Sequence, residues 1–198
     1  MNINDNSVNI KNTTLRYHHG DLRAALVAAG LDLLKNRAAD ALSLREVARV
    51  VGVSATAVYR HFPDKKALLY ALCSEGAEAL GRAQADAMRV AAGGVAGFDA
   101  TGRAYVRFAL AHPALYRLMM SVHPSREMSG EGTAISGAMR LLLDNVAELL
   151  PPESTERERR LAAIHAWSLV HGMAMLMLDG QIPADDATIE SICGSALV

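Results

Sequence analysis

Apolar residues recur three or four positions apart along most of the chain, which is the spacing of one face of an α-helix. The first such set predicts a helix from about residue 20 to 37 and consists of Leu22, Leu26, Ala29 and Leu33. After Pro63, Asp64 can cap a further helix over 65–90. Glycines and prolines then separate helical stretches at roughly 98–111, 113–121, 131–150, 154–179 and 185–195. Because no useful stretch alternates like a strand, the pattern predicts an all-α fold of about nine helices.

Two short helices are predicted between residues 43 and 61. Ser43 as N-cap and Glu46 three residues later match a capping box at the start of the first one. Gly52 ends this helix, and Ser54 can cap a second helix that runs to His61. Two short helices joined by three or four residues that include a glycine are the sequence form of a helix-turn-helix.

The residue types suit this motif position by position. Ala48 is small where the second helix crosses the first, and Gly52 can adopt the positive φ of the turn. Apolar residues that can pin the second helix onto the first are Val53, Val58 and Phe62. The exposed remainder is Ser54, Ala55, Thr56, Tyr59, Arg60 and His61. Such a set fits a helix whose first turn meets base edges while its flank touches phosphates, although a plain helical hairpin shares the same spacing.

Composition and charge narrow the class of protein. With 51% apolar and 21% charged residues, the chain can bury a sizeable core, which excludes disorder for most of it. Residues 1–15 show no period, and we expect a flexible arm there. The net charge of −1 hides an asymmetry, because residues 1–70 carry a balance of +4 and residues 71–198 a balance of −5. A basic first third favours a polyanion as its partner.

Several stretches resemble the TetR family of bacterial transcriptional regulators. Residues 53–69, VSATAVYRHFPDKKALL, are similar to the signature of that family, and residues 17–23, YHHGDLR, to the opening of its first helix. Residues 112–119 and 167–172 resemble a C-terminal subgroup of the Trp-His-Gly (WHG) type. The resemblance implies a three-helix helix-turn-helix DNA-binding domain over 16–70. It also implies a ligand-binding and dimerisation domain over 71–198, built as an antiparallel bundle of about six helices.

The resemblance also implies roles inside the motif. It makes Ala55 and Thr56 the base readers and Tyr59, His61 and Lys65 the phosphate contacts, although Lys65 can also be read as a solvated surface residue. Neither base reader offers the bidentate pairing that makes one base decisive, so Arg45, Arg60 and DNA shape are expected to contribute. The predicted DNA-binding residues are therefore Arg45, Ser54, Ala55, Thr56, Tyr59, Arg60, His61 and Lys65.

Residues 71–198 hold no recognisable catalytic constellation. His165 and His171 are six positions apart and fall on different helix faces, which disfavours a zinc site. No Ser-His-Asp spacing, P-loop or dinucleotide fingerprint occurs. We therefore expect no enzymatic activity, no cofactor and no metal.

Large apolar side chains with a few polar tips gather in the second part of the chain. Trp167 and His171 are four positions apart and share a helix face. A methionine-rich lining suits varied apolar ligands, but a plain core would show the same stripe; the resemblance favours an effector cavity. The candidate ligand-binding residues are Tyr105, Phe108, His112, Tyr116, Met119, Met120, Trp167, His171 and Met175.

The stretch 161–178 just reaches membrane-spanning length, but it contains histidines and follows the charge run 156–160. We interpret it as a buried or interface helix, and the resemblance makes helices 154–179 and 185–195 the dimerisation pair. Two distant cysteines and no basic-then-apolar leader favour the cytoplasm.

These features predict a cytoplasmic, homodimeric repressor that binds a palindromic operator in double-stranded DNA and responds to a small-molecule effector, with no membrane involved. The alternative is a helical small-molecule-binding protein or enzyme in which the helix-turn-helix is only scaffold. That alternative would keep its activity after deletion of residues 1–70.

Overall fold

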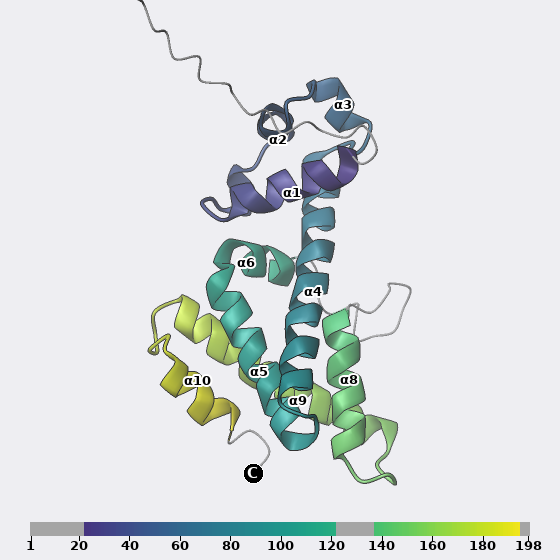
Figure 1. The fold of residues 1–198 in the computed structure, drawn as a ribbon, viewed down its shortest axis with the longest axis vertical. Coiled ribbons are helices and arrows are strands. Elements are labelled where there is room, and N and C mark those ends of the chain that lie inside the picture. Colours follow the sequence, from purple (N-terminus) through teal and green to yellow (C-terminus); the bar gives the residue numbers. More distant parts are fainter. Residues whose placement is uncertain (1–21, 122–136, 195–198) are drawn as a thin grey trace, which may run out of the picture.

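The computed structural model describes residues 22–121 and 137–194, and these contain nine α-helices and one short 3₁₀ turn but no strand (Figure 1). The elements are α1 (Leu22–Leu34), η1 (Ala39–Ala41), α2 (Leu44–Val51), α3 (Ala55–Tyr59), α4 (Lys65–Val90), α5 (Gly94–Ala111), α6 (Pro113–Ser121), α8 (Gly137–Leu149), α9 (Glu156–Leu178) and α10 (Asp186–Cys193). The all-α prediction is confirmed. The predicted arm over 1–15 and the predicted helical residues 131–136 and 195 lie outside the described residues.

Most predicted boundaries agree with the structure to within a few residues, and α4 and α6 agree fully. The main difference is α5, which begins at Gly94 rather than near 98. Ala92, Gly93 and Gly94 all have positive φ, and the chain reverses over the three residues that connect α4 to α5. The next helix then starts at once, with the Gly97 amide donating to the Gly93 carbonyl at 2.9 Å.

The helices form two groups that share α4 (Figure 1). α1, α2 and α3 gather at one end of this helix, while α5 and α8 pack along its other half, α9 packs against α5 and α8, and α10 packs against α5. The predicted domain boundary near residue 70 therefore falls inside α4. α6 lies at the junction of the two groups, because it packs against α4 and α5 and also contacts α1 and η1.

Two glycines allow the closest helix contacts across this junction. A Cβ atom on Gly30 of α1 would lie 2.9 Å from the Leu72 side chain of α4. A Cβ atom on Gly76 of α4 would lie 2.8 Å from the sulfur of Met119 in α6. α1 and α6 are thus both held tightly against α4, and a movement of either helix has to displace buried side chains.

Candidate DNA interface and effector site

The turn between α2 and α3 has the backbone geometry that the sequence predicts. Gly52 adopts φ +78° in the left-handed region, and the carbonyl of Ala48 accepts from the amides of Gly52 and Val53 at 2.9 and 3.0 Å. Val58 is 0% exposed and Phe62 is 2% exposed, so both anchor α3 in the core. The helix-turn-helix prediction is confirmed in these residues.

The start of α2 differs from the prediction in one respect. Ser43 Oγ accepts from the Glu46 amide at 3.2 Å, which is the expected N-cap. The Glu46 carboxylate, however, accepts from Arg37 Nη1 at 2.5 Å and lies 3.9 Å from Arg49. The predicted capping box is therefore only half formed, because charge-assisted bonds to two arginines hold the carboxylate instead.

α3 lies at the opposite end of the described fold from α8, α9 and α10 (Figure 1). Its N-cap Ser54 accepts from the Ala57 amide at 3.2 Å. Tyr59 is 48% exposed although its neighbour Val58 is fully buried, so its ring points away from the core. The predicted DNA-binding residues that are exposed are Arg45, Ser54, Thr56, Tyr59, Arg60 and His61, while Ala55 is half-buried.

Lys65 has a structural partner that the sequence did not indicate. Its Nζ donates to the carbonyl of Asp40 at 2.5 Å, which ties the start of α4 to η1. An ammonium group has three hydrogens, so a phosphate could still bind to the same nitrogen. The neighbouring Lys66 lies over the Tyr70 ring, with its nitrogen 5.6 Å from the ring centre.

Four of the candidate effector residues meet in one hydrogen-bonded cluster between α5, α6 and α9. Trp167 Nε1 donates to the Tyr105 hydroxyl at 3.2 Å, and the hydroxyls of Tyr105 and Tyr116 are 3.2 Å apart. His171 Nδ1 lies 2.7 Å from the Tyr116 hydroxyl and 3.4 Å from that of Tyr105. The two tyrosines are buried, and Trp167 and His171 are half-buried. We call these four residues the ring cluster.

Burial controls the protonation of the ring cluster. Desolvation lowers the pKa of His171, which favours the neutral imidazole. Burial raises the pKa of Tyr105, and its side-chain hydrogen bonds with Tyr116 and Trp167 act in the opposite direction. The pKa of Tyr116 is raised by burial and by the neighbouring Tyr105. At neutral pH the cluster is therefore an uncharged set of donors and acceptors.

The other candidate effector residues pack more like a core. Phe108 and Met119 are buried, Met120 and Met175 are half-buried, and His112 is exposed with its ring 4.8 Å from that of Phe108. The structure thus joins Tyr105, Tyr116, Trp167 and His171 by hydrogen bonds. The remaining candidate residues make no hydrogen bond to the ring cluster in the described part of the chain.

Two buried amides were not predicted as site residues. Gln84 of α4 is 8% exposed and donates from Nε2 to the Thr101 carbonyl at 3.2 Å, while its Oε1 has no partner among the described residues. Asn145 of α8 is 3% exposed, and its Nδ2 likewise has no partner in the described part of the chain. Gln84 is one turn after Leu80, and Asn145 is three positions after Leu142. Each amide thus occupies an apolar position of its helix, and this spacing could have predicted its burial from the sequence. Each unpaired atom can satisfy a bound polar group or water.

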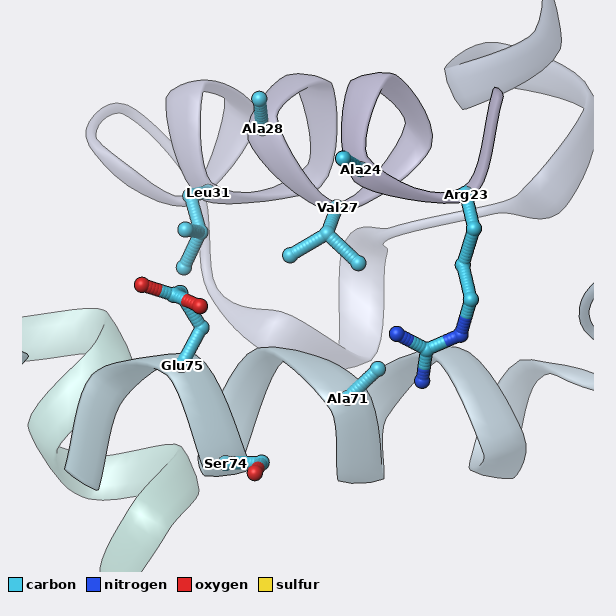
Figure 2. A pocket seen from close by; sticks show the side chains of 8 residues that line it. All are labelled: Arg23, Ala24, Val27, Ala28, Leu31, Ala71, Ser74 and Glu75. Carbon is cyan, nitrogen blue, oxygen red and sulfur yellow. The ribbon is translucent and has the colours of Figure 1, made fainter. Parts of the chain in front are cut away.

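A separate cleft of about 400 Å³ lies between α1 and α4 (Figure 2). Its ends carry opposite charges, from Arg23 and Glu75, and its middle is lined by small and apolar side chains. Arg23 stacks over the Phe62 ring at 5.4 Å, and Glu75 accepts from Arg82 at 2.9 Å. This cleft lies in the same helix group as α2 and α3, and its lining includes none of the candidate effector residues. Among the described residues, no group of three or more His, Cys, Asp or Glu side chains could hold a metal.

α9 leaves much of its apolar surface uncovered. It is the one described helix that is long and apolar enough to cross a membrane by length and composition, and 22% of its most apolar window is buried in the subunit. One stripe of this helix consists of the exposed Leu161, Ile164, Ser168 and Leu176, with the half-buried Gly172 between them. We call this stripe the open face of α9. A side chain added at Gly172 would meet nothing within 4 Å.

Comparisons with known proteins agree with this arrangement. Residues 26–72 match the sequence profile of the bacterial regulatory proteins of the tetR family, and residues 98–193 match the Tetracyclin repressor-like C-terminal domain. A solved protein with unknown function from Rhodococcus sp. RHA1 is 32% identical, with a TM-score of 0.71 over 92% of this chain and 94% of that one.

Two further structures share the fold at lower identity. One is a TetR family transcription regulator from Marinobacter aquaeolei VT8, which is 21% identical, with a TM-score of 0.62 over 87% of this chain and 94% of that one. The other is the TetR family repressor AlkX from Dietzia sp. strain DQ12-45-1b, which is 19% identical, with a TM-score of 0.53 over 86% of this chain and 93% of that one.

Proposed function

Because the chain belongs to the TetR family of DNA-binding transcriptional regulators, we propose that it is a homodimeric repressor that leaves a palindromic operator when a small molecule binds. One observation carries this proposal: α3 is held in the core by the buried Val58, while Thr56 and Tyr59 of the same helix are exposed. A helix held in this way can enter the major groove without losing its own packing. The half-buried Ala55 and exposed Thr56 lie in its first turn, where base edges are read.

The open face of α9 supports the homodimer. Leu161, Ile164 and Leu176 are exposed large apolar side chains, and exposing them together in water is unfavourable. A second copy can cover the stripe by a two-fold contact in which each α9 meets the other. Gly172 permits a close approach there, since nothing lies within 4 Å of its Cβ position. Two copies would carry two recognition helices for two operator half-sites.

The position of α6 supports a route from effector to DNA. This helix contributes Tyr116 to the ring cluster, and it also packs against α4, α1 and η1. A ligand that shifts Tyr116 would therefore push on the helices that support α2 and α3. A nearly complete switch requires about 5.5 kcal/mol of preference for the released conformation.

DNA binding can be tested by fluorescence anisotropy with the intergenic DNA that flanks the gene. We expect tight binding that weakens steeply with salt, because phosphate contacts release counterions. Tyr59→Ala should weaken binding about tenfold, and Arg60→Ala should also lower the salt slope. Tyr70→Ala is the matched control, because Tyr70 is 45% exposed on α4 and should leave the affinity unchanged. An affinity that does not respond to salt or to Tyr59→Ala would contradict the proposal.

A further inference from the structure

The ring cluster forms one continuous line of hydrogen-bonding groups that ends at His171. The line runs from Trp167 Nε1 to the Tyr105 hydroxyl, then to the Tyr116 hydroxyl, and then to His171 Nδ1. Its shortest contact, 2.7 Å, is the last one. Because the indole nitrogen can only donate, the Tyr105 oxygen accepts at the start of the line.

The donors and acceptors of the ring cluster determine which ring nitrogen of the neutral His171 carries the proton. If Nδ1 carried it, Trp167, His171 and both tyrosine hydroxyls would all be donors, and the two hydroxyl oxygens would be the only acceptors in the cluster. Two neighbouring hydroxyls cannot donate to each other at once, so either Tyr105 or Tyr116 would keep a buried, unpaired hydrogen. If Nδ1 accepts, Tyr116 donates to it, Tyr105 donates to Tyr116, and every hydrogen is paired. The cluster therefore favours the tautomer with the proton on Nε2.

The Nε2–H group remains available for a further contact. The hydrogen bonds of His171 in the described part of the chain involve Nδ1, and Nε2 is not among the buried atoms that lack a partner. A nitrogen that is absent from that set and has no bond to a described residue keeps contact with solvent, so we infer that the exposed part of this half-buried residue includes Nε2. The rings of Tyr116 and Trp167 lie 5.9 and 6.1 Å from the His171 ring, centre to centre. An accessible donor between aromatic rings is suited to a polar atom on an apolar molecule.

We propose that the effector carries a carbonyl oxygen on an apolar body, and that this oxygen accepts a hydrogen bond from His171 Nε2–H. The inference rests on the proposed function as a ligand-responsive regulator. No hydrogen bond of the ring cluster in the described residues involves a charged side chain. The ring cluster offers a carboxylate no cationic partner to offset its desolvation, whereas a ketone, ester or amide carbonyl carries no charge to desolvate. Tyr116 acts as a positioning residue, because its hydroxyl keeps the proton of His171 on Nε2.

The tautomer can be measured without any ligand. Nuclear magnetic resonance on the full chain with isotope-labelled histidine separates a protonated ring nitrogen from an unprotonated one. We expect His171 to be protonated on Nε2, and Tyr116→Phe to convert it to a mixture of tautomers. Tyr70→Phe, which removes an exposed tyrosine hydroxyl on α4, should change nothing. A proton on Nδ1 in the unchanged protein would overturn the inference.

The acceptor preference can be measured with acetophenone and ethylbenzene, which share a carbon skeleton and differ by the carbonyl oxygen. Titration against the His171 ring signals should show acetophenone binding about fivefold to tenfold more tightly, as expected for one net hydrogen bond. His171→Phe should abolish the difference, and His171→Gln should retain part of it, because its amide nitrogen can replace Nε2. If His171→Phe does not fold, the comparison of the two probes on the unchanged protein still decides the matter.

Three results would overturn the inference. These are equal affinities for the two probes, no binding of acetophenone, and an Nε2–H signal that responds to protein concentration instead of to the ketone. The last result would mean that a second copy supplies the acceptor. DNA binding of the same preparations, followed by anisotropy, separates this failure from that of the proposed function. A chain that binds no DNA refutes the regulator, whereas equal probe affinities refute only the carbonyl.

Discussion

The protonation of one residue, His171, makes the stability of the ring cluster depend on pH. Its pKa is lowered because burial disfavours the charged imidazolium, and its Nδ1 faces the buried Tyr116 hydroxyl at 2.7 Å. Protonation would replace this acceptor by a donor that points at a hydroxyl already donating. The folded chain therefore binds this proton less readily than the unfolded chain does.

We expect the free energy of unfolding to decrease as the pH falls through about 6.5, the ordinary pKa of histidine. In this range the unfolded chain takes up the proton while the folded chain still excludes it, and the decrease ends below the lowered pKa of the folded state. Urea unfolding between neutral pH and mildly acidic pH measures the effect. His171→Gln, which cannot titrate, should show a weaker pH dependence, and an unchanged dependence would contradict this account.

At the scale of elements, helix starts depend on single side chains. Ser54 and Asp64 accept from the amides of Ala57 and Ala67, as the sequence predicts. A full capping box occurs instead at the start of α9. There Glu158 accepts from the Thr155 amide at 2.7 Å, and Thr155 Oγ1 accepts from the Glu158 amide. The Glu158 carboxylate accepts from both the amide and the hydroxyl of Thr155, and these two bonds lower its pKa. The difference from α2 arises because no arginine competes for the carboxylate of Glu158 in the described contacts.

The short helix α3 should be the element most sensitive to its cap. Five residues cannot form a stable helix alone, so α3 relies on Ser54 and on the packing of Val58. We expect Ser54→Ala to lower the free energy of unfolding by about 1 kcal/mol and to weaken DNA binding. Ser74→Ala, an exposed position inside α4, is the control and should alter neither quantity. Urea unfolding and anisotropy measure the two effects, and equal losses in both variants would contradict the role of the cap.

At the scale of the whole molecule, α4 and α6 join the two helix groups, and the described residues leave the open face of α9 uncovered. Gly30 and Gly76 let α1 and α6 pack closely against α4, beside the side chains of Leu72 and Met119. In the regulator that we propose, assembly and signalling therefore use different surfaces. The open face of α9 would form the dimer, and the contacts of α6 would transmit the effector's action to α1 and η1.

Gly172→Glu separates assembly from folding. The Cβ position of Gly172 is open in the single subunit, so the glutamate should leave the subunit folded. In a dimer it would place an unpaired charge in the contact and weaken association by about 100-fold or more. Analytical ultracentrifugation should show dimers for the unchanged chain and monomers for the variant, with a parallel loss of operator affinity. Val90→Glu, at a position that is 79% exposed at the end of α4, should remain dimeric; dimeric Gly172→Glu would place the interface elsewhere.

Local sequence signals were sufficient for much of the fold and for the DNA-binding motif. Apolar periodicity located the helices. The turn requires a left-handed backbone conformation, φ +78°, and the sequence places a glycine, Gly52, at that position. The exposure of Tyr59, Arg60 and His61 followed from the same periodicity, since their neighbours Val58 and Phe62 are the apolar positions. These properties depend on residues within one or two helical turns of each other.

Long-range contacts were decided by the tertiary structure alone. The stripe of rings and methionines predicted both a pocket and a core, and only the packing of α5, α6 and α9 shows which four side chains bond to one another. The same holds for the carboxylate of Glu46, the partner of Lys65, and the buried amides of Gln84 and Asn145. A sequence specifies the local conformation and the face of each helix through nearest neighbours. Which faces meet, and hence where protons and ligands are held, depends on how separate helices pack in three dimensions.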